Sequence, residues 1–209
     1  MPPKLYQTHL KRLLDIAFSL LVIWVGLLFL PAIALLIKVA SRGNVFYVHE
    51  RLSKDGQPFN AIKFRTMRPD ADQRLADYFI KNPNARLEYA DTFKLKNDPR
   101  IIAGAGRFLR KTSLDELPQF INVLKGEMSV VGPRPIVEEE KAKYGRFYEK
   151  LASVKPGITG LWQVSGRSET NYRERVAYDT YYLQSWSVWL DLWILLNTFG
   201  AVIKGKGAY

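Results

Sequence analysis

The sequence predicts a helix-rich α+β fold, in which a proline-broken, re-entrant membrane helix precedes a compact domain with a small β-hairpin and interfacial amphipathic helices. Three observations predict this fold class. One long apolar run contains a proline, two strand-like segments enclose turn residues, and aromatic side chains gather in the last two helical segments. The composition changes near residue 42, so we divide the chain into a membrane segment, residues 1–42, and a second domain, residues 43–209.

Composition limits the classes of partner. The chain has 209 residues, 47% of them hydrophobic, and its formal charge of +11 indicates an anionic partner. This partner is nucleic acid, an anionic membrane or a phosphorylated small molecule. The sequence has no zinc-ligand pattern and no aromatic RNA-binding signature, so we expect no nucleic acid. The absence of cysteine excludes disulfides, thiolate metal sites and a thiol nucleophile.

The apolar run extends from Leu13 to Ile37 and, at about 1.5 Å per residue, can cross a bilayer core roughly 30 Å thick. Pro31 removes a backbone hydrogen bond inside the run and predicts a break there. Basic residues flank both ends, which places both ends on the cytoplasmic side. We therefore favour a monotopic, re-entrant helix, with the rest of the chain on the cytoplasmic side, over a full span. The flanking cations are Lys4, Lys11, Arg12, Lys38, Arg42, Arg51 and Lys54.

A β-hairpin is predicted after this run. Residues 45–48 and 59–64 have strand-like composition, and the turn chemistry of residues 54–57 lies between them. Alternation along the second strand places Lys63 and Arg65 on one face. These cations either point to a common ligand or protect a solvated edge strand, and the pattern alone does not choose.

The remaining chain reads as helices separated by turns. The predicted helices are residues 70–81, 107–111, a buried helix after Pro118 that ends at Gly126, and residues 136–151, 172–184 and 186–202. Aromatic residues cluster at the junction of the last two, namely Tyr181, Tyr182, Trp186, Trp189 and Trp193. Because Trp and Tyr favour the lipid headgroup level, these helices are expected at the membrane surface, although core packing explains the cluster nearly as well.

The segment from Thr112 to Pro135 carries the main chemical signal. Two adjacent carboxylates, Asp115 and Glu116, follow the cations Arg110 and Lys111 and precede Arg134. Anions beside cations indicate phosphate or metal chemistry. Alternatively, Asp115 or Ser113 caps the helix that begins near Pro118. The two interpretations are compatible, because a capping carboxylate can still face a metal.

Two loops supply further candidates. Arg134 lies between Pro133 and Pro135, which limit its conformations before binding and suit bidentate contact with phosphate. The alternative is a rigid surface turn. The second loop, residues 155–167, surrounds single polar residues with glycines and a proline, as expected of a segment that wraps a ligand.

Taken in order, these motifs resemble the bacterial sugar transferases, the monotopic phosphoglycosyl transferases that move a sugar-1-phosphate from a UDP-sugar to a polyprenyl phosphate. The resemblance covers essentially the whole chain, and it is greatest to the catalytic part of the undecaprenyl-phosphate galactose phosphotransferases. The matching segments are the apolar helix with its proline and residues 63–67, 93–100, 110–119, 132–135, 155–163, 165–167 and 207–209.

The resemblance implies a two-step covalent reaction. Asp115 would attack the sugar-linked phosphorus and expel UMP, and undecaprenyl phosphate would then take the sugar phosphate from the aspartyl intermediate. Asp115 and Glu116 would also hold Mg²⁺. The substrate-binding candidates are Arg110, Arg134, Lys63, Arg65, Gln163 and Arg167. Galactose-1-phosphate is favoured over glucose-1-phosphate, and the product would begin the assembly of an O-antigen, exopolysaccharide or capsule.

The sequence departs from the family pattern at two points. Leu30 precedes Pro31 where the family commonly has serine. The larger galactose enzymes carry additional transmembrane helices and a further domain, so we expect either a minimal natural form or a piece of a longer protein, acting as a monomer or a homodimer. The alternative from another functional class is a non-catalytic, membrane-anchored basic adaptor that binds anionic lipid or nucleic acid.

Overall fold

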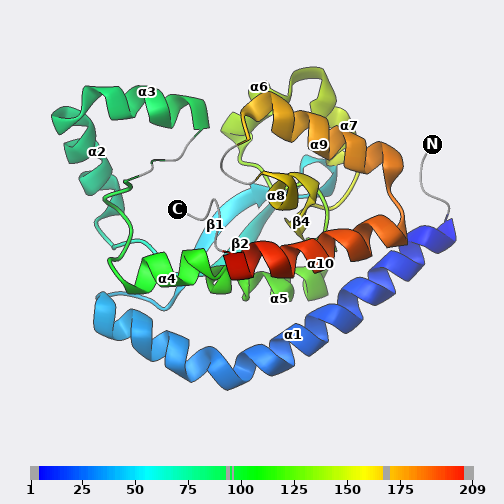
Figure 1. The fold of residues 1–209 in the computed structure, drawn as a ribbon, viewed down its shortest axis with the longest axis horizontal. Coiled ribbons are helices and arrows are strands. Elements are labelled where there is room, and N and C mark those ends of the chain that lie inside the picture. Colours follow the sequence, from blue (N-terminus) through cyan, green and yellow to red (C-terminus); the bar gives the residue numbers. More distant parts are fainter. Residues whose placement is uncertain (1–4, 93–94, 96, 167–169, 205–209) are drawn as a thin grey trace.

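The computed structural model describes residues 5–92, 95, 97–166 and 170–204. It confirms the helix-rich α+β class with one small antiparallel hairpin. One long N-terminal helix lies along the lower edge of a body made of shorter helices and two small sheets (Figure 1).

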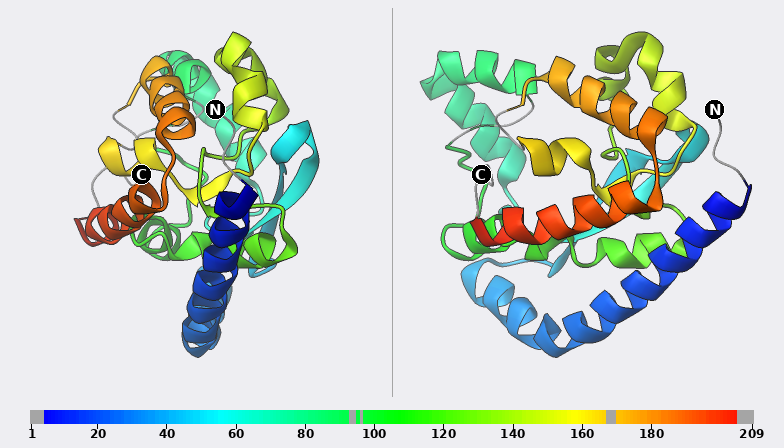
Figure 2. Two further views of the ribbon diagram at one scale, coloured as in Figure 1. Left: turned by 90° about the vertical axis from the view of Figure 1, so that its right-hand side faces the viewer. Right: turned by 45° about the vertical axis from the view of Figure 1, so that its right-hand side comes forward.

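Helix α1, Leu5–Ala40, is one continuous helix of 36 residues that passes through Pro31. The predicted break is therefore wrong in one respect, because the helix bends without being interrupted. A proline removes a single intrahelical hydrogen bond, and the turns on either side keep theirs. Figures 1 and 2 show the bend past the midpoint of α1, with its convex side facing away from the body.

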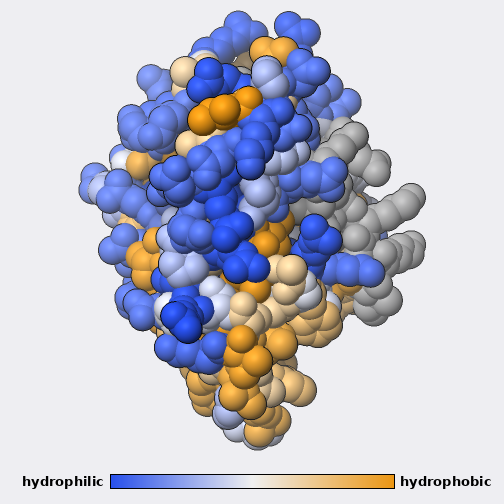
Figure 3. Space-filling view, turned by 90° about the vertical axis from the view of Figure 1, so that its left-hand side faces the viewer, coloured by the Kyte–Doolittle hydropathy of each residue, from blue (hydrophilic) through white to orange (hydrophobic). Residues whose placement is uncertain are grey.

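Both arms of α1 pack on the body, whereas the middle of the helix is exposed. In the N-terminal arm Asp15 and Ser19 are buried, and in the C-terminal arm Ile33 and Ile37 pack with Phe64. The exposed apolar residues between the arms are Leu20, Leu21, Trp24, Val25, Leu27, Leu28 and Phe29. Figure 3 shows hydrophobic surface gathered at this lower end of the molecule, below a mostly hydrophilic body. This one helix is long and apolar enough to cross a membrane.

The predicted hairpin is confirmed. Strand β1, Phe46–Leu52, pairs antiparallel with strand β2, Pro58–Phe64, and the 3-10 turn η1, Lys54–Gly56, joins them. Strand β1 extends four residues beyond its predicted end, because cross-strand pairing outweighs the weak strand propensity of its charged residues.

Two helices form an arm that projects from the body (Figure 1). Helix α2, Ala71–Lys81, is the helix predicted over residues 70–81. Helix α3, Pro83–Thr92, was not predicted, because a proline two residues after the predicted helix over residues 70–81 indicates a turn. Proline is well tolerated in the first position of a helix, since its missing amide hydrogen would have no partner there.

The central segment contains helix α4, Ala105–Lys111, the 3-10 turn η2, Leu114–Glu116, and helix α5, Gln119–Lys125. Helix α5 ends at Gly126, whose φ of 88° confirms the predicted left-handed cap. Phe120 and Val123 of α5 belong to the largest buried apolar cluster. The η2 turn is thereby fixed between two helices that pack on α1 and the hairpin.

A second sheet, which the sequence did not predict, pairs strand β3, Ser129–Val131, with strand β4, Gly157–Thr159, in parallel. Strands of three residues are too short to show alternation. The single helix predicted over residues 136–151 is wrong, because Gly145 has a φ of 50° and interrupts it. The segments found there are η3, Glu138–Glu140, α6, Lys141–Tyr144, η4, Gly145–Phe147, and α7, Tyr148–Ala152.

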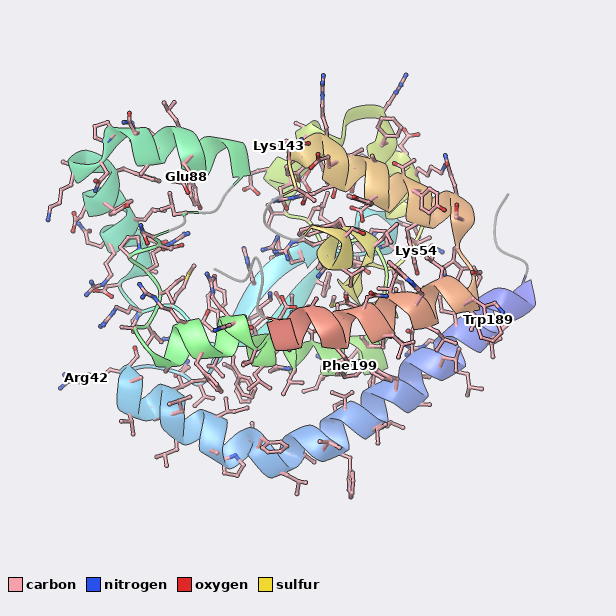
Figure 4. All side chains as sticks on the ribbon, in the orientation of Figure 1. Arg42, Lys54, Glu88, Lys143, Trp189 and Phe199 are labelled. Carbon is pink, nitrogen blue, oxygen red and sulfur yellow. The ribbon has the colours of Figure 1, made fainter. Side chains whose placement is uncertain are left out.

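Three helices complete the chain: α8, Leu161–Ser165, α9, Tyr172–Ser185, and α10, Val188–Lys204. The last two confirm the predicted helices. Their aromatic cluster is divided, since Tyr182 is 3% exposed in the core and Trp189 is 80% exposed on α10. Trp189 and Phe199 lie near opposite ends of α10 (Figure 4), and both side chains are exposed.

Candidate active site

A recess on the body brings together side chains that are far apart in the sequence. Strands β1 and β2, the η2–α5 segment, the loop after β3 and the β4–α8 segment form its wall. Its lining residues are Arg51, Ala61, Lys63, Glu116, Gln119, Arg134, Pro135, Ile158 and Gln163. A neighbouring recess shares Arg134 but has no carboxylate in its lining. The recess lined by Glu116 is therefore the candidate site. Four residues predicted from the sequence line it, namely Lys63, Glu116, Arg134 and Gln163.

Asp115 lies in the η2 turn beside this recess and is 9% exposed. Burial and the adjacent Glu116 raise the pKa of Asp115 to about 6, although Lys63 and Arg110 oppose this shift. The predicted cap is absent, because neither the Asp115 carboxylate nor the Ser113 hydroxyl caps helix α5. Ser113 has a left-handed φ of 55° and makes no capping hydrogen bond, and α5 begins only after Pro118. Asp115 is thus a buried carboxyl whose charged form is disfavoured, as is common at reactive sites.

Glu116 points into the recess, where Lys63 Nζ lies 2.7 Å from its Oε1 atom. The pair is partly exposed, so its attraction is screened by solvent. The described residues contain no cluster of three or more His, Asp or Glu side chains that suits a metal. The adjacent Asp115 and Glu116 nevertheless offer two hard oxygen donors, and Mg²⁺ usually completes such a site with water and substrate phosphates.

Arg110 reaches the same region from α4. Its Nε atom donates to Thr66 Oγ1 at 3.1 Å, immediately after strand β2. Burial lowers the pKa of Arg110, and the charges of Asp115 and Asp98 oppose this shift. Asp98 is itself paired with Arg100, whose Nη2 lies 2.6 Å from its Oδ2. A buried cation therefore lies close enough to Asp115 to favour its charged form.

Arg134 follows strand β3 and is held where the chain after β3 packs on the start of β4. Gly157 donates its amide hydrogen to Pro133 O at 2.7 Å, and a Cβ atom on Gly157 would collide with the backbone of Gly132. Only glycine permits this approach. The Arg134 guanidinium then lies 5.9 Å from the ring centroid of Trp162 on α8. The two glycine-containing motifs of the sequence thus form one support for the arginine.

The remaining predicted residues have different positions. Gln163 lines the recess and donates from Nε2 to Ile158 O at 2.9 Å. Arg65 is not among the residues that line it, and its guanidinium lies beside Gly43. The Arg65 amide still donates to Val45 O at 2.8 Å, one position beyond the paired strands, so the shared face of Lys63 and Arg65 stays a prediction. Arg167 lies outside the described residues.

Sequence reasoning missed Arg51 and Gln119, which both line the recess. Arg51 was counted only among the cations that flank the apolar run. Its place on β1 gave no signal, because the strand predicted there ended at residue 48 and alternation could not be followed to Arg51. Gln119 gave no signal beyond its place in a motif, because an amide in a helix is ordinarily a solvated residue.

The chain is similar to known proteins over almost its whole length. The family described as bacterial sugar transferase matches residues 6–205. The chain is 48% identical, over 96% of its length, to a UDP-galactose-lipid carrier transferase of Erwinia amylovora. It is 46% identical, over 95% of its length, to the exopolysaccharide production protein ExoY of Rhizobium meliloti, and 39% identical, over 96%, to a UDP-glucose:undecaprenyl-phosphate glucose-1-phosphate transferase of Escherichia coli. It covers 42%, 88% and 41% of these relatives, respectively.

Proposed function

The chain belongs to the bacterial sugar transferase family, and from this premise we propose that it transfers a hexose-1-phosphate from a UDP-sugar to undecaprenyl phosphate and releases UMP. The observation that carries the proposal is the position of Asp115. This carboxyl is buried, its pKa is raised to about 6, and it adjoins a recess that contains Lys63, Glu116 and Arg134. A membrane-anchored adaptor would have no need of a destabilised carboxyl beside a cationic recess.

The reaction has two displacements at one phosphorus atom. An Asp115 oxygen forms a bond to the sugar-linked phosphorus as the bond from that phosphorus to the UMP oxygen breaks, and UMP leaves with the electron pair. A phosphate oxygen of the lipid then attacks the same phosphorus, and the bond to Asp115 breaks. The products are UMP and a lipid diphosphate sugar, and the carboxylate is regenerated.

The surrounding side chains support this chemistry. Asp115 must be deprotonated to attack, and the Lys63 and Arg110 cations favour that state. Glu116, held by Lys63, and Asp115 are the residues that would hold Mg²⁺. The ion, when bound, supplies positive charge to the transferring phosphoryl group. Arg134 is fixed in direction by its flanking prolines and suits a phosphate oxygen.

Helix α1 supports a re-entrant position in the cytoplasmic leaflet of the inner membrane. Its exposed apolar middle lies between two arms that both pack on the body, so both ends lie on the side of the body. The chain lacks cysteine, which permits single-cysteine variants at the exposed His9 and Asn44. We expect both to react with a membrane-impermeant thiol reagent only from the cytoplasmic side. Labelling of the two positions from opposite sides would indicate a full span.

Galactose is the first candidate for the transferred hexose. The Erwinia relative named for UDP-galactose is 48% identical to the chain, and the Escherichia relative named for UDP-glucose is 39% identical. The two sugars differ in the orientation of one hydroxyl group. A specific hydrogen bond to that hydroxyl is the kind of contact that separates such substrates.

The decisive experiment measures UMP release by the purified chain with undecaprenyl phosphate and Mg²⁺. UDP-galactose, UDP-glucose and UDP-N-acetylglucosamine are compared, with Asp115→Asn as the inactive variant. We expect release with UDP-galactose to exceed that with UDP-glucose, and no release above background from Asp115→Asn. Undiminished release by this variant would refute the nucleophile, and lipid binding without release from any UDP-sugar would favour the adaptor.

A further inference from the structure

The recess extends well beyond the carboxylates. In the hairpin register Lys63 lies opposite Tyr47, whereas Arg51 lies opposite Phe59, so the two cations are four residue positions apart on one face. At about 3.3 Å per residue, their backbones are separated by roughly 13 Å. Both side chains nevertheless line the same recess. It therefore has a carboxylate end at Lys63 and Glu116 and a second, cationic end at Arg51.

The second end has an arginine whose charge is weakly compensated. Arg51 Nη2 lies 3.1 Å from His49 Nδ1, and because an arginine can only donate, this histidine nitrogen accepts. Burial and nearby cations lower the pKa of His49 to about 4, so the ring is neutral at pH 7 and orients Arg51 without cancelling its charge. The carboxylate partner, Glu140, is 3.6 Å away and also accepts from the amide of Val137 at 3.1 Å.

Two further groups converge on Arg51. Arg134 lines the same recess and, after burial, is the largest cause that lowers the pKa of Arg51 to about 10. An anion between the two guanidinium groups would offset the repulsion that lowers the pKa of Arg51. Gln119 is 2% exposed and also lines the recess, and among the described residues its Nε2 atom has no acceptor. A buried amide donor without a partner costs stability unless a ligand accepts from it.

The position of this end favours a soluble ligand over the lipid. Phe64, next to Lys63, packs on Ile33 of the membrane helix. Leu52, next to Arg51, instead packs on the cluster that contains Ile136 and Leu151, on the opposite part of the body. The carboxylate end of the recess is therefore nearer the apolar part of α1. A phosphate on a soluble nucleotide fits the Arg51 end, and the lipid phosphate fits the other.

Resting on the proposed function, we propose that Arg51, Arg134 and Gln119 form the subsite for the phosphate of the leaving UMP, and that His49 is the positioning residue for Arg51. The nucleotide phosphate of the donor then lies at the Arg51 guanidinium, and the sugar-linked phosphate, joined to it through one oxygen atom, lies next to it on the side of Asp115. When the bond between the two phosphates breaks, the new negative charge on UMP develops next to two guanidinium groups and one amide donor.

The test measures equilibrium binding of UMP, uridine and a short-chain prenyl phosphate to the full chain in detergent micelles, and so needs no turnover. Arg51→Gln is expected to weaken UMP binding by about 10- to 100-fold, with uridine and prenyl phosphate binding unchanged. The matched control is Arg146→Gln, which removes the same charge from an exposed residue outside the recess. Gln119→Leu is expected to weaken UMP binding by about tenfold.

Variants of His49 distinguish a role in positioning Arg51 from a role in packing alone. His49→Leu removes the acceptor and is expected to weaken UMP binding by about three- to fivefold, whereas His49→Gln retains an acceptor and restores most of the affinity. Arg51→Lys, which keeps the charge, provides a second variant if Arg51→Gln unfolds. Its UMP affinity should lie between those of wild type and a charge deletion, because lysine cannot form the bidentate contact.

The outcomes distinguish this inference from the proposed function. Wild-type UMP affinity in Arg51→Lys and Gln119→Leu, with UMP release intact, would overturn the subsite and leave the transferase in place. Loss of UMP affinity in these variants, in a chain that turns over no UDP-sugar, would support the subsite and refute the transferase. An equal loss of prenyl phosphate binding would assign Arg51 to the lipid and overturn the inference.

Discussion

Asp15 and Asp115 are both buried carboxylates, yet their surroundings differ in kind. Asp15, in the N-terminal arm of α1, accepts from Ser129 Oγ at 2.8 Å and from the Val130 amide at 3.0 Å. Asp115 has cations within electrostatic range, but among the described residues no hydrogen bond from another residue to its carboxylate is found, and Glu116 adds like charge. A buried carboxylate that accepts hydrogen bonds from other residues is held in place. A buried carboxylate that accepts none from other residues remains able to react.

Polar contacts around Asp15 attach the N-terminal part of α1 to the body. Arg12, one turn earlier on α1, donates to Val123 O at 2.6 Å and Leu124 O at 2.9 Å at the end of α5. Lys11 forms an ion pair of 2.6 Å with Asp191 of α10. The polar part of α1 therefore joins three elements of the body. The charges of this part of α1 fix the position of the helix on the body, whereas under the proposed function the charges around Asp115 act on a substrate.

The largest expected effect comes from replacing Asp115, the reactive carboxylate of the two. Asp115→Asn should reduce the rate of UMP release by at least about 10³-fold, because an amide cannot form the aspartyl intermediate. The measurement is release of labelled UMP from UDP-galactose under single-turnover conditions. Glu149→Gln, at an exposed position on α7, is the control and should keep the wild-type rate. A rate within tenfold of wild type for Asp115→Asn would place the nucleophile elsewhere.

The second prediction concerns Asp15, the carboxylate with a structural role. Asp15→Ala leaves the Ser129 hydroxyl and the Val130 amide buried without their acceptor, so the free energy of unfolding should fall by about 2–4 kcal/mol. Chemical denaturation in detergent measures this loss. The rate of UMP release per folded molecule should stay within about threefold of wild type. A large loss of rate without loss of stability would mean that Asp15 also acts in the reaction.

Sequence reasoning found the elements whose signals are local. The hairpin was predictable because turn residues separate two strand-like segments, and the Gly126 cap because glycine follows an apolar helix. Asp115 and Glu116 stood out as adjacent anions among cations. The break at Pro31 was overstated, because sequence indicates where a helix loses a bond but not whether neighbouring turns hold it together.

The missed features depend on contacts between distant segments. Strands β3 and β4 have three residues each, and the backbone approach of Gly132 and Gly157 that supports Arg134 exists only in the folded chain. Arg51 carries no local sign of its meeting with Arg134.

A third prediction concerns the cost of the charged form of Asp115 to the stability of the fold. The pKa of Asp115 in the fold, about 6, lies above its usual value of 3.8, so the charged form costs folding free energy. In metal-free buffer Asp115→Asn should therefore be more stable than wild type by about 2 kcal/mol at pH 8, with the advantage vanishing as pH falls from 6 to below 4. Denaturation at pH 4 and pH 8 tests the sign. A capping role would instead make the variant less stable at pH 8.

The smallest effect concerns the two charges nearest Asp115. Lys63 favours its charged form and Glu116 disfavours it, so Lys63→Met should raise the pKa of Asp115 and Glu116→Gln should lower it, each by about 0.5–1 unit. The carboxyl stretching band of Asp115, identified by its loss in Asp115→Asn, reports this pKa in an infrared titration without metal. Because Lys63 and Glu116 also pair with each other at 2.7 Å, the double variant should return the pKa close to wild type. Shifts in the same direction for both single variants would show that solvent entry, rather than charge, controls Asp115, and its likeness to a reactive carboxyl would then rest on burial alone.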